Sequence, residues 1–461
     1  MVATAVAPPP PTDQADDQEV LPAPLAPSLQ RVPLPLLADA ASYEPCTFDY
    51  EASIDAPTRD DEVCLREWID VFRHSNPTFA ANIRSSAENG CASPRERGSK
   101  ADAYASFFSA ALDRELERAR ARARARGGSR AGGEGGGRVS CVSLCRLRDG
   151  VLASLGFRDV FLRVKRAEDA AALALLPGVL KSLDDAAGGA GELGGGPRAR
   201  LELAVRGVLA GNVFDLGAAA SAELFASGEG GGADAFRRTR DGGLLPRPWA
   251  VDDLDALLDA LLPPEPAGGA PAAASSAAPA APFRKAILFA DNAGSDVLLG
   301  LLPFARELLR LGVPSVVLAA NSAPTLNDTT AAELGPLLIA AAKADPDPSL
   351  LPRAVASGSL RVVASGSVLP VIDLRLCSPE LAAECVLEEG EKDGVDGAAG
   401  GILLLLEGMG RGIETNLRAS FSCAALRIGV IKHPEVARCL KGRMYDPVVR
   451  FTAAASKREG R

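Results

Sequence analysis

The stretch KAILFADNAG, residues 285–294, decides the fold, because a continuous apolar run ends abruptly in polar residues. An apolar run without alternation is typical of a strand that is buried on both faces. The next segment, DVLLGLLPFARELLRLG (296–312), has the spacing of an amphipathic helix, and a second apolar run, SVVLAAN, occupies 315–321. A strand, a helix and a strand in this order predict a parallel pair joined by a crossover helix.

Three more apolar runs extend this pattern: LRVVAS at 360–365, GILLLLEG at 401–408 and LRIGVIK at 426–432. We therefore predict an α/β fold built on a mostly parallel sheet that helices cover on both faces. Ligands of such sheets bind beyond the carboxyl ends of the strands. Polar residues stand at this end of every run: Asp291, Asn292, Asn321, Ser322, Ser365, Glu407, Lys432 and His433.

The chain before these runs is expected to be helical. From about residue 60, apolar residues recur at helical spacing, as in CLREWIDVFRH (64–74), with glycine-rich inserts between such segments. The segment PEPAGGAPAAASSAAPAAP (264–282) has the composition of a linker. The predicted organisation is a disordered Pro/Ala-rich arm (1–57), an all-helical N-terminal region (58–262), a linker (263–282), an α/β domain (283–455) and a tail (456–461).

Composition narrows the classes of function. With 50 Lys and Arg against 59 Asp and Glu, the formal net charge is -9, so nucleic acid and anionic membranes are poor partners. Only two histidines are present, which excludes a zinc site with several His ligands. The nine scattered cysteines favour a reducing compartment. Because no apolar run reaches ~18 residues and no targeting pattern is visible, we expect a cytoplasmic protein.

The tract RARARARAR (118–126) places arginine all round a helix, which favours a solvated helix end. The alternative is that this tract binds RNA, and the negative net charge of the chain disfavours this alternative.

Asp291, Asn292 and Asp328 are candidate metal ligands. Two carboxylates and an amide oxygen are hard donors, which suit Mg²⁺ or Mn²⁺ rather than Zn²⁺. Three such ligands leave positions open for water and phosphate oxygens. The alternative is that Asp-Asn-Ala-Gly is only the turn that ends a strand. Haloacid-dehalogenase-type phosphatases are disfavoured, because the second Asp that they require is replaced by Ala293.

The motif EGMGR, residues 407–411, is a candidate phosphate-binding turn. Its glycines let backbone N–H groups approach an anion, and its arginine can bind phosphate through two N–H groups. It is not the dinucleotide fingerprint, because Ile413 stands where a glycine is needed, and it is not a P-loop. Lys432 is a further candidate for phosphate binding, with a plain surface lysine as the alternative.

With these motifs assembled, the chain resembles the metal-dependent damage-control phosphatase family. The segments FADNAGSDVLLGLLPFARELLRLG, NSAPTLNDTT, LPVIDL, EGMGRGIETN and IKHPEVA occur in the order found in that family, and EGMGR is the hallmark of its subfamily II. LREWIDVF, CRLRDGVLASLGFRDVF, GVLAGNVFDLG and LPRPWAVDDLD extend the resemblance, so that it covers most of residues 60–455. Subfamily II includes plant stand-alone enzymes and the C-terminal domain of an animal pantothenate-kinase-like protein.

The resemblance implies an all-helical N-terminal region joined to a Rossmann-like three-layer α/β/α domain. It also implies a divalent-metal-dependent hydrolysis of phosphate monoesters. The implied ion is Mn²⁺ or Mg²⁺, with Co²⁺ and Ni²⁺ as further candidates. The implied substrate is a small phosphorylated metabolite, namely phosphopantetheine or its oxidatively damaged forms. A sugar-phosphate phosphatase and a non-catalytic metal- and phosphate-binding regulatory protein are the alternatives. Neither nucleic acid nor membrane is an expected partner, and the oligomeric state stays open.

By motif match, the resemblance assigns metal ligation to Asp291, Asn292 and Asp328, and catalysis to Asp291, Glu407 and Arg411. Either a metal-bound water attacks the phosphate or Asp291 is the nucleophile. Contacts to substrate or phosphate are expected from Asn321, Ser322, Gly408, Met409, Gly410, Arg411 and Lys432.

The helical region also holds candidates. Asn212 and Asp215, in AGNVFDLG, are expected to contribute to the cleft, with capping of a buried helix as the alternative. The chain departs from the family at Ala364 and Val368, where relatives commonly have polar residues, and this departure bears on substrate choice.

Overall fold

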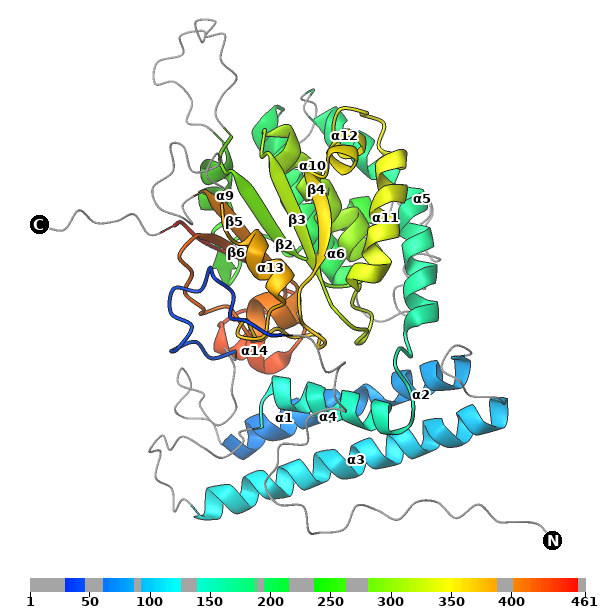
Figure 1. Cartoon of the computed structure of the whole chain (residues 1–461). Coiled ribbons are helices and arrows are strands. Elements are labelled where there is room, and N and C mark those ends of the chain that lie inside the picture. Colours follow the sequence, from blue (N-terminus) through cyan, green and yellow to red (C-terminus); the bar gives the residue numbers. More distant parts are fainter. Residues whose placement is uncertain are drawn as a thin grey trace, which may run out of the picture.

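A seven-stranded sheet forms the centre of the computed structural model (Figure 1). The strand order is β1-β7-β6-β5-β2-β3-β4, and every neighbouring pair is parallel except β6 and β7. The predicted α/β fold with a mostly parallel sheet is therefore confirmed. The structure describes residues 30–45, 61–86, 93–125, 139–186, 188, 195–214, 236–262, 281–387 and 401–454.

Five strands coincide with the apolar runs: β2 (Lys285–Phe289), β3 (Ser315–Ala320), β4 (Leu360–Ala364), β5 (Ile402–Glu407) and β6 (Ala424–Val430). Every residue of β2, β3, β5 and β6 is buried, as expected for strands covered on both faces. Two further strands were not predicted. They are the short β1 (Val251–Asp252) and the antiparallel β7 (Pro447–Thr452), which extend the sheet beyond β6.

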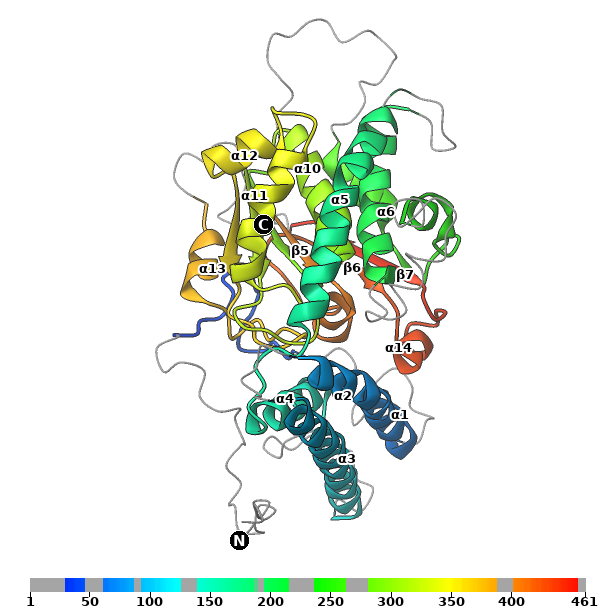
Figure 2. The same cartoon turned by 90° about the vertical axis from the view of Figure 1, so that its right-hand side faces the viewer.

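One face of the sheet is covered by helices from both halves of the chain (Figure 2). These helices are α5 (Leu162–Ala186), α6 (Pro197–Phe214), α9 (Leu254–Leu261), α10 (Leu302–Arg310), α11 (Ala331–Ala344) and α12 (Leu351–Ser357). Their apolar side chains share one buried core with Ala286, Leu403 and Leu426 of the sheet. The boundary expected at residue 262 therefore does not separate two structural units, because α5, α6 and α9 need the sheet to bury their apolar faces.

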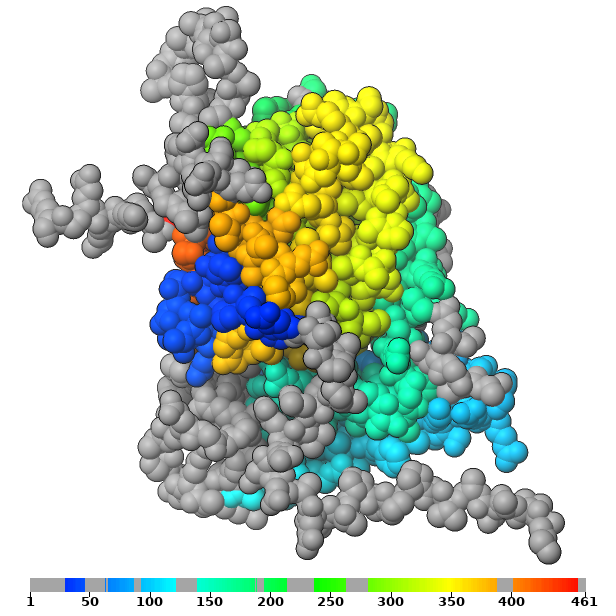
Figure 3. Space-filling model, viewed as in Figure 1, coloured from blue at the N-terminus to red at the C-terminus, as the bar shows by residue number. Residues whose placement is uncertain are grey.

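The opposite face is covered more thinly, by α13 (Pro379–Glu384), by residues 371–377 and by residues 30–45. Leu34, Leu36 and Tyr43 are buried against this face. The backbone N–H of Leu34 also donates to the Leu374 carbonyl at 2.8 Å. Figure 3 shows this N-terminal segment in blue, lying across the surface of the domain.

The N-terminal segment 30–45 therefore differs from the disordered arm expected over residues 1–57. The reason is its leucine-rich sequence VPLPLLADA, which supplies enough apolar surface to pack on the sheet. The rest of the expected arm, 1–29 and 46–57, lies outside the described residues, as do most of the linker and the whole tail.

Four helices form a separate bundle beside the carboxyl edge of the sheet (Figure 1). They are α1 (Asp61–His74), α2 (Asn76–Ser85), α3 (Pro94–Ala125) and α4 (Cys141–Ser154). Their core continues into α14 (Pro434–Cys439) and into Ile413 and Ile431, which follow the strand ends. This bundle confirms the predicted helical N-terminal region. Within the described ranges, no helix is both long and apolar enough to cross a membrane.

Candidate active site

The strand order places a topological switch point between β2 and β5. From β2 the chain proceeds outward to β3 and β4 on one side, whereas β5 leads to β6 on the other. Ligands of open α/β sheets bind at such a point, beyond the carboxyl ends of the strands. Asp291 and Asn292 follow β2, Asn321 follows β3, and Glu407 ends β5, so the fold brings these predicted residues to one edge.

Arg411 is the centre of the cluster at this edge. Its guanidinium group forms ion pairs with Asp291 and, at 2.5 Å, with Asp328. It also donates a hydrogen bond to Asn321 Oδ1 at 3.0 Å, and the Asn321 amide donates to Asp328 Oδ2 at 3.0 Å. All four side chains are buried. Residues that are far apart in the sequence thus form one hydrogen-bonded group, in which a single cation bridges two carboxylates.

Gly408 allows the EGMGR motif to lie against Asp291. Its backbone has φ 89° and ψ 160°, a region that is essentially restricted to glycine. A Cβ atom at this position would stand 2.0 Å from Asp291 Oδ2. The motif then continues as the π-helical segment η5 (Met409–Glu414), which carries Arg411 back over the end of β2. The first glycine of the motif is therefore required by close approach as well as by backbone conformation.

Asn212 reaches the same cluster from α6. Its amide donates to Asp291 Oδ2 at 3.4 Å and to Asp296 Oδ2 at 3.3 Å, and its carbonyl accepts from the Val430 N–H at 3.0 Å. Gly211 lets the helix come this close, because a Cβ atom there would stand 2.9 Å from the Asp296 Cα. Asn212 therefore lies beside Asp291 and Asp296, and its contribution to a substrate cleft stays a prediction. Asp215, its predicted companion, lies outside the described residues.

Asn292 and Asp296 complete this layer. The Asn292 amide donates to Asp291 Oδ2 at 2.8 Å and to Asp296 Oδ2 at 2.9 Å. Asp296 is the first residue of the π-helical segment η3 (Asp296–Leu301) and is 1% exposed. Two amides, Asn212 and Asn292, thus hold Asp291 and Asp296 together.

Glu407 ends β5 and lies beside the Asp296 carboxyl group. It is completely buried, and no N–H or hydroxyl group in the described part of the chain donates to either of its oxygens. Burial raises the pKa of Glu407 well above its usual value, and the neighbouring Asp296 carboxylate raises it further. A buried carboxyl group in this position favours taking up a proton or a cation.

Three predicted contact residues lie at the margin of the Arg411 cluster. Ser322 accepts from the Gly366 N–H at 2.8 Å and so shapes the loop that follows β4. Met409 accepts at its sulfur from the Lys432 N–H at 3.0 Å. Burial raises the pKa of Glu414 to about 7, and the charge of Lys432 opposes this rise. The positive charge of Lys432 is therefore close enough to act on Glu414.

Gly410 is also fixed by close packing, because a Cβ atom there would stand 2.3 Å from the Pro370 carbonyl oxygen. Its role, like that of Gly408, follows from backbone approach.

Sequence reasoning missed two charged residues of α5 that hold the site loops. Lys165 is 1% exposed and pairs with Asp159 at 2.9 Å and with Glu333 at 2.7 Å. It also donates to the Asp328 carbonyl at 3.4 Å. Asp169, one turn further on, accepts from the Gly294 N–H at 2.8 Å. The available signal was a lysine and an aspartate four residues apart on the apolar face of one helix.

The donor set can be tested against the divalent ion that the resemblance implies. Among the described residues, no three acidic, histidine or cysteine side chains form a ready-made metal site. Asp291 and Asp328 instead converge on Arg411, and Asn292 adds an amide. Even so, four buried carboxyl groups, Asp291, Asp296, Asp328 and Glu407, stand against the single guanidinium of Arg411. This uncompensated acidity fits a hard divalent cation.

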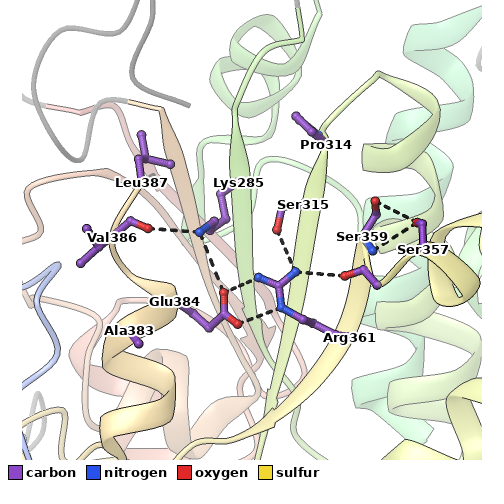
Figure 4. A pocket seen from close by; sticks show the side chains of 11 residues that line it. Lys285, Pro314, Ser315, Ser357, Ser359, Arg361, Ala383, Glu384, Val386 and Leu387 are labelled. Carbon is purple, nitrogen blue, oxygen red and sulfur yellow. Dashed lines mark hydrogen bonds and ion pairs between the residues drawn. The ribbon is translucent and has the colours of Figure 1, made fainter. Parts of the chain in front are cut away.

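A polar cavity of about 570 Å³ lies at the opposite edge of the sheet, at the amino ends of β2, β3 and β4 (Figure 4). Lys285 lies 3.9 Å from Glu384, and Arg361 donates to the same carboxylate at 2.8 Å. Both cations that line this cavity, Lys285 and Arg361, are therefore already neutralised by Glu384. The cavity also lies at the other end of β2 from Asp291. The candidate active site is accordingly the carboxyl edge.

The fold and this cluster define an α/β protein with a buried site of carboxyl groups, amides and one arginine at the switch point of a parallel sheet. Residues 71–448 match the family model described as the damage-control phosphatase ARMT1-like domain. The chain therefore belongs to this family of damage-control phosphatases, and the family predicted from the motifs is confirmed. Its place in subfamily II stays a prediction.

Three relatives from curated proteins show how far the similarity extends. A damage-control phosphatase of Arabidopsis thaliana is 36% identical over 450 residues, covering 95% of this chain and 99% of the relative. Pantothenate kinase 2 of Arabidopsis thaliana is 34% identical over 439 residues, covering 90% of this chain and 41% of the relative. The 4'-phosphopantetheine phosphatase of Mus musculus is 29% identical over 462 residues, covering 91% of this chain and 48% of the relative. The chain thus spans less than half the length of the last two.

Proposed function

We propose that the chain is a divalent-metal-dependent phosphatase of small metabolites, and that its substrate is phosphopantetheine or an oxidised form of it. The family supports the reaction class. The name of the mouse relative, 4'-phosphopantetheine phosphatase, supports the substrate. The observation that carries the proposal is the buried cluster in which Asp291, Asp328 and Arg411 meet at the switch point of the sheet.

In this proposal Asp291 and Asp328, with Asn292, hold the divalent ion. When bound, the ion supplies Lewis-acid polarisation of the phosphoryl group. Arg411 already bridges both carboxylates, so ion and guanidinium compete for them. A guanidinium group that leaves one carboxylate has N–H groups available for a phosphate oxygen, which suits its planar fork of donors.

Two further groups have defined roles in the proposal. Asn321 fixes the orientation of both Asp328 and Arg411 through its amide. Burial and the neighbouring Asp296 raise the pKa of Glu407 well above its usual value, which favours its protonated form. A protonated Glu407 can donate to a phosphate oxygen or to the leaving alkoxide. Two nucleophiles fit the remaining step, water and the Asp291 carboxylate.

The test is phosphate release from phosphopantetheine and from a panel of sugar phosphates, with Mn²⁺, with Mg²⁺ and with a chelator. We expect turnover of phosphopantetheine that depends on the metal. Asp291→Asn should lower kcat/KM by at least about 100-fold. Asp185→Asn is the matched control, because this carboxylate on α5 is 64% exposed. Equal activity of the two variants contradicts the site, and full activity with the chelator contradicts the metal.

A further inference from the structure

Asp296 is a buried acid of the site that neither binds the ion nor contacts the substrate in the proposed function. It is the first residue of η3 and is 1% exposed. The carboxyl group of Glu407 lies beside it, and Glu407 is completely buried as well. Two carboxyl groups side by side in a buried place repel each other when both are ionised. Packing alone therefore does not account for an acid at position 296.

One oxygen of Asp296, Oδ2, accepts three hydrogen bonds from two asparagines. The Asn292 side chain donates to it at 2.9 Å, and the Asn292 backbone N–H donates to it at 3.3 Å. The Asn212 side chain donates to it at 3.3 Å. Two of the three bonds come from Asn292, which is one of the proposed ligands of the divalent ion. Asp296 is thus bound to this ligand through both its main chain and its side chain.

The contacts of Asn292 decide which end of its amide faces the ion. Its Nδ2 atom lies between Asp296 Oδ2, at 2.9 Å, and Asp291 Oδ2, at 2.8 Å. Ionised carboxylates only accept hydrogen bonds, so the atom between them must be the amide nitrogen with its two N–H groups. Since oxygen and nitrogen lie on opposite sides of the planar amide, Oδ1 points away from both carboxylates. The oxygen is also the amide atom that a hard cation binds.

Asn212 holds Asp296 in place from α6. Its Oδ1 accepts from the Val430 N–H at 3.0 Å, so its Nδ2 faces the carboxylates of Asp291 and Asp296. A series of hydrogen bonds thus runs from the backbone of β6 through Asn212 and Asp296 to Asn292. A backbone N–H can only donate, and a carboxylate can only accept, so the orientation of each amide in this series is fixed.

We propose that Asp296 is a positioning residue for the divalent ion, which holds the Asn292 amide with its oxygen toward the ion. Without an acceptor at position 296, the amide can turn and present N–H groups, which repel a cation. Asp291 also accepts from this amide, but as a ligand it shares its charge with the ion, whereas Asp296 keeps its charge for the amide. The inference rests on the proposed function, because it takes Asn292 to be a ligand of the ion.

Asp296→Ala tests this role, because it removes the acceptor without adding volume. The readout is the Kd for Mn²⁺, measured with the full chain by following free Mn²⁺ in a titration. We expect binding about tenfold weaker than in the wild type, as for other residues that orient metal ligands. Asp185→Ala is the matched control, because this carboxylate is 64% exposed, and it should bind Mn²⁺ like the wild type.

A second background separates orientation from charge. In Asn292→Asp, residue 292 presents an oxygen to the ion whichever way its side chain lies. Adding Asp296→Ala to this background should therefore weaken Mn²⁺ binding by less than about twofold, because no amide is left to orient. Asp296→Asn keeps the size of the side chain and provides a further variant. Its neutral acceptor should give a smaller loss with the same dependence on the background.

Each outcome decides the inference. The same loss of affinity in both backgrounds overturns it, because Asp296 then acts only through its charge. Unchanged Mn²⁺ binding in Asp296→Ala also overturns it, and the proposed function stands if that chain still hydrolyses phosphopantetheine. A wild type that does not bind Mn²⁺ overturns both. A loss confined to chains with Asn292, in a wild type that does not hydrolyse phosphopantetheine, supports the positioning role and contradicts the proposed function.

Discussion

Replacing Gly408 by alanine tests the geometry of the site most directly. The backbone of Gly408, with φ 89° and ψ 160°, costs other residues about 1–3 kcal/mol. The new Cβ atom would also stand 2.0 Å from Asp291 Oδ2, so the carboxylate must move, at a further cost of about 1–3 kcal/mol. We expect the free energy of unfolding to fall by about 4 kcal/mol, the middle of the summed range. The ion pair between Asp291 and Arg411 should be lost with it.

The measurements are urea denaturation and the affinity for Mn²⁺ in a binding titration. Gly358→Ala is the matched control, because Gly358 has φ 77° but no atom within 4 Å of the added Cβ. This control should lose only the conformational term, about 1 kcal/mol. The difference between the variants, about 3 kcal/mol, then combines the contact with Asp291, about 2 kcal/mol, with the larger conformational cost of the Gly408 backbone, about 1 kcal/mol more. The reasoning is refuted if Gly408→Ala loses no more stability than Gly358→Ala and binds Mn²⁺ as tightly as the wild type.

Two further predictions concern the buried charges. Burial lowers the pKa of His433 from 6.5 to about 4. Its contribution to stability, about 3 kcal/mol, is therefore present above pH 6.5 and lost as the pH falls through 4, and this part of the pH dependence should vanish in His433→Gln. Lys165→Met removes the cation that pairs with the carboxylates of Asp159 and Glu333. The free energy of unfolding, measured by urea denaturation, should therefore fall by about 3–5 kcal/mol. Lys181→Met, at a lysine that is 70% exposed, should stay within about 0.5 kcal/mol of the wild type.

The inner strands could be predicted because a strand covered on both faces is a continuous apolar run. β2 and β5 show this pattern without interruption. β1 could not be predicted, because two residues carry no periodicity. β7 begins at a proline, and its last three residues are only half-buried, so its sequence lacks the signal of a central strand.

The residues at the strand ends could be predicted from the rule that parallel strands present their ligands at one edge. Asp291, Asn321 and Glu407 reach the site in this way. The pairing of Asp291 and Asn321 with Arg411 could not be predicted, because it depends on the path of η5 after the glycine at 408. Lys165 escaped notice for a different reason. Lys165 lies 120 residues before the start of β2, and no local feature of the sequence indicates which loops its helix will contact.

The domain boundary predicted at residue 262 is wrong, because helices before it cover part of the sheet that forms after it. A parallel sheet needs helices on its faces, and the crossovers from β2 to β5 supply α10 to α13. Between β5 and β6, residues 408–423 contain only the short η5, so the apolar residues Leu403 and Leu426 need a cover from elsewhere. Helix α6 provides this cover, and the hydrogen bond from the Val430 N–H to Asn212 fixes α6 beside β6, while α5 packs on α6 and η3. The composition of residues 263–282 therefore identifies a linker, but it does not identify a domain boundary. The domain begins further upstream, because the sheet needs covering helices that the chain after residue 283 does not supply. The same requirement explains why an asparagine far upstream stands beside Asp291.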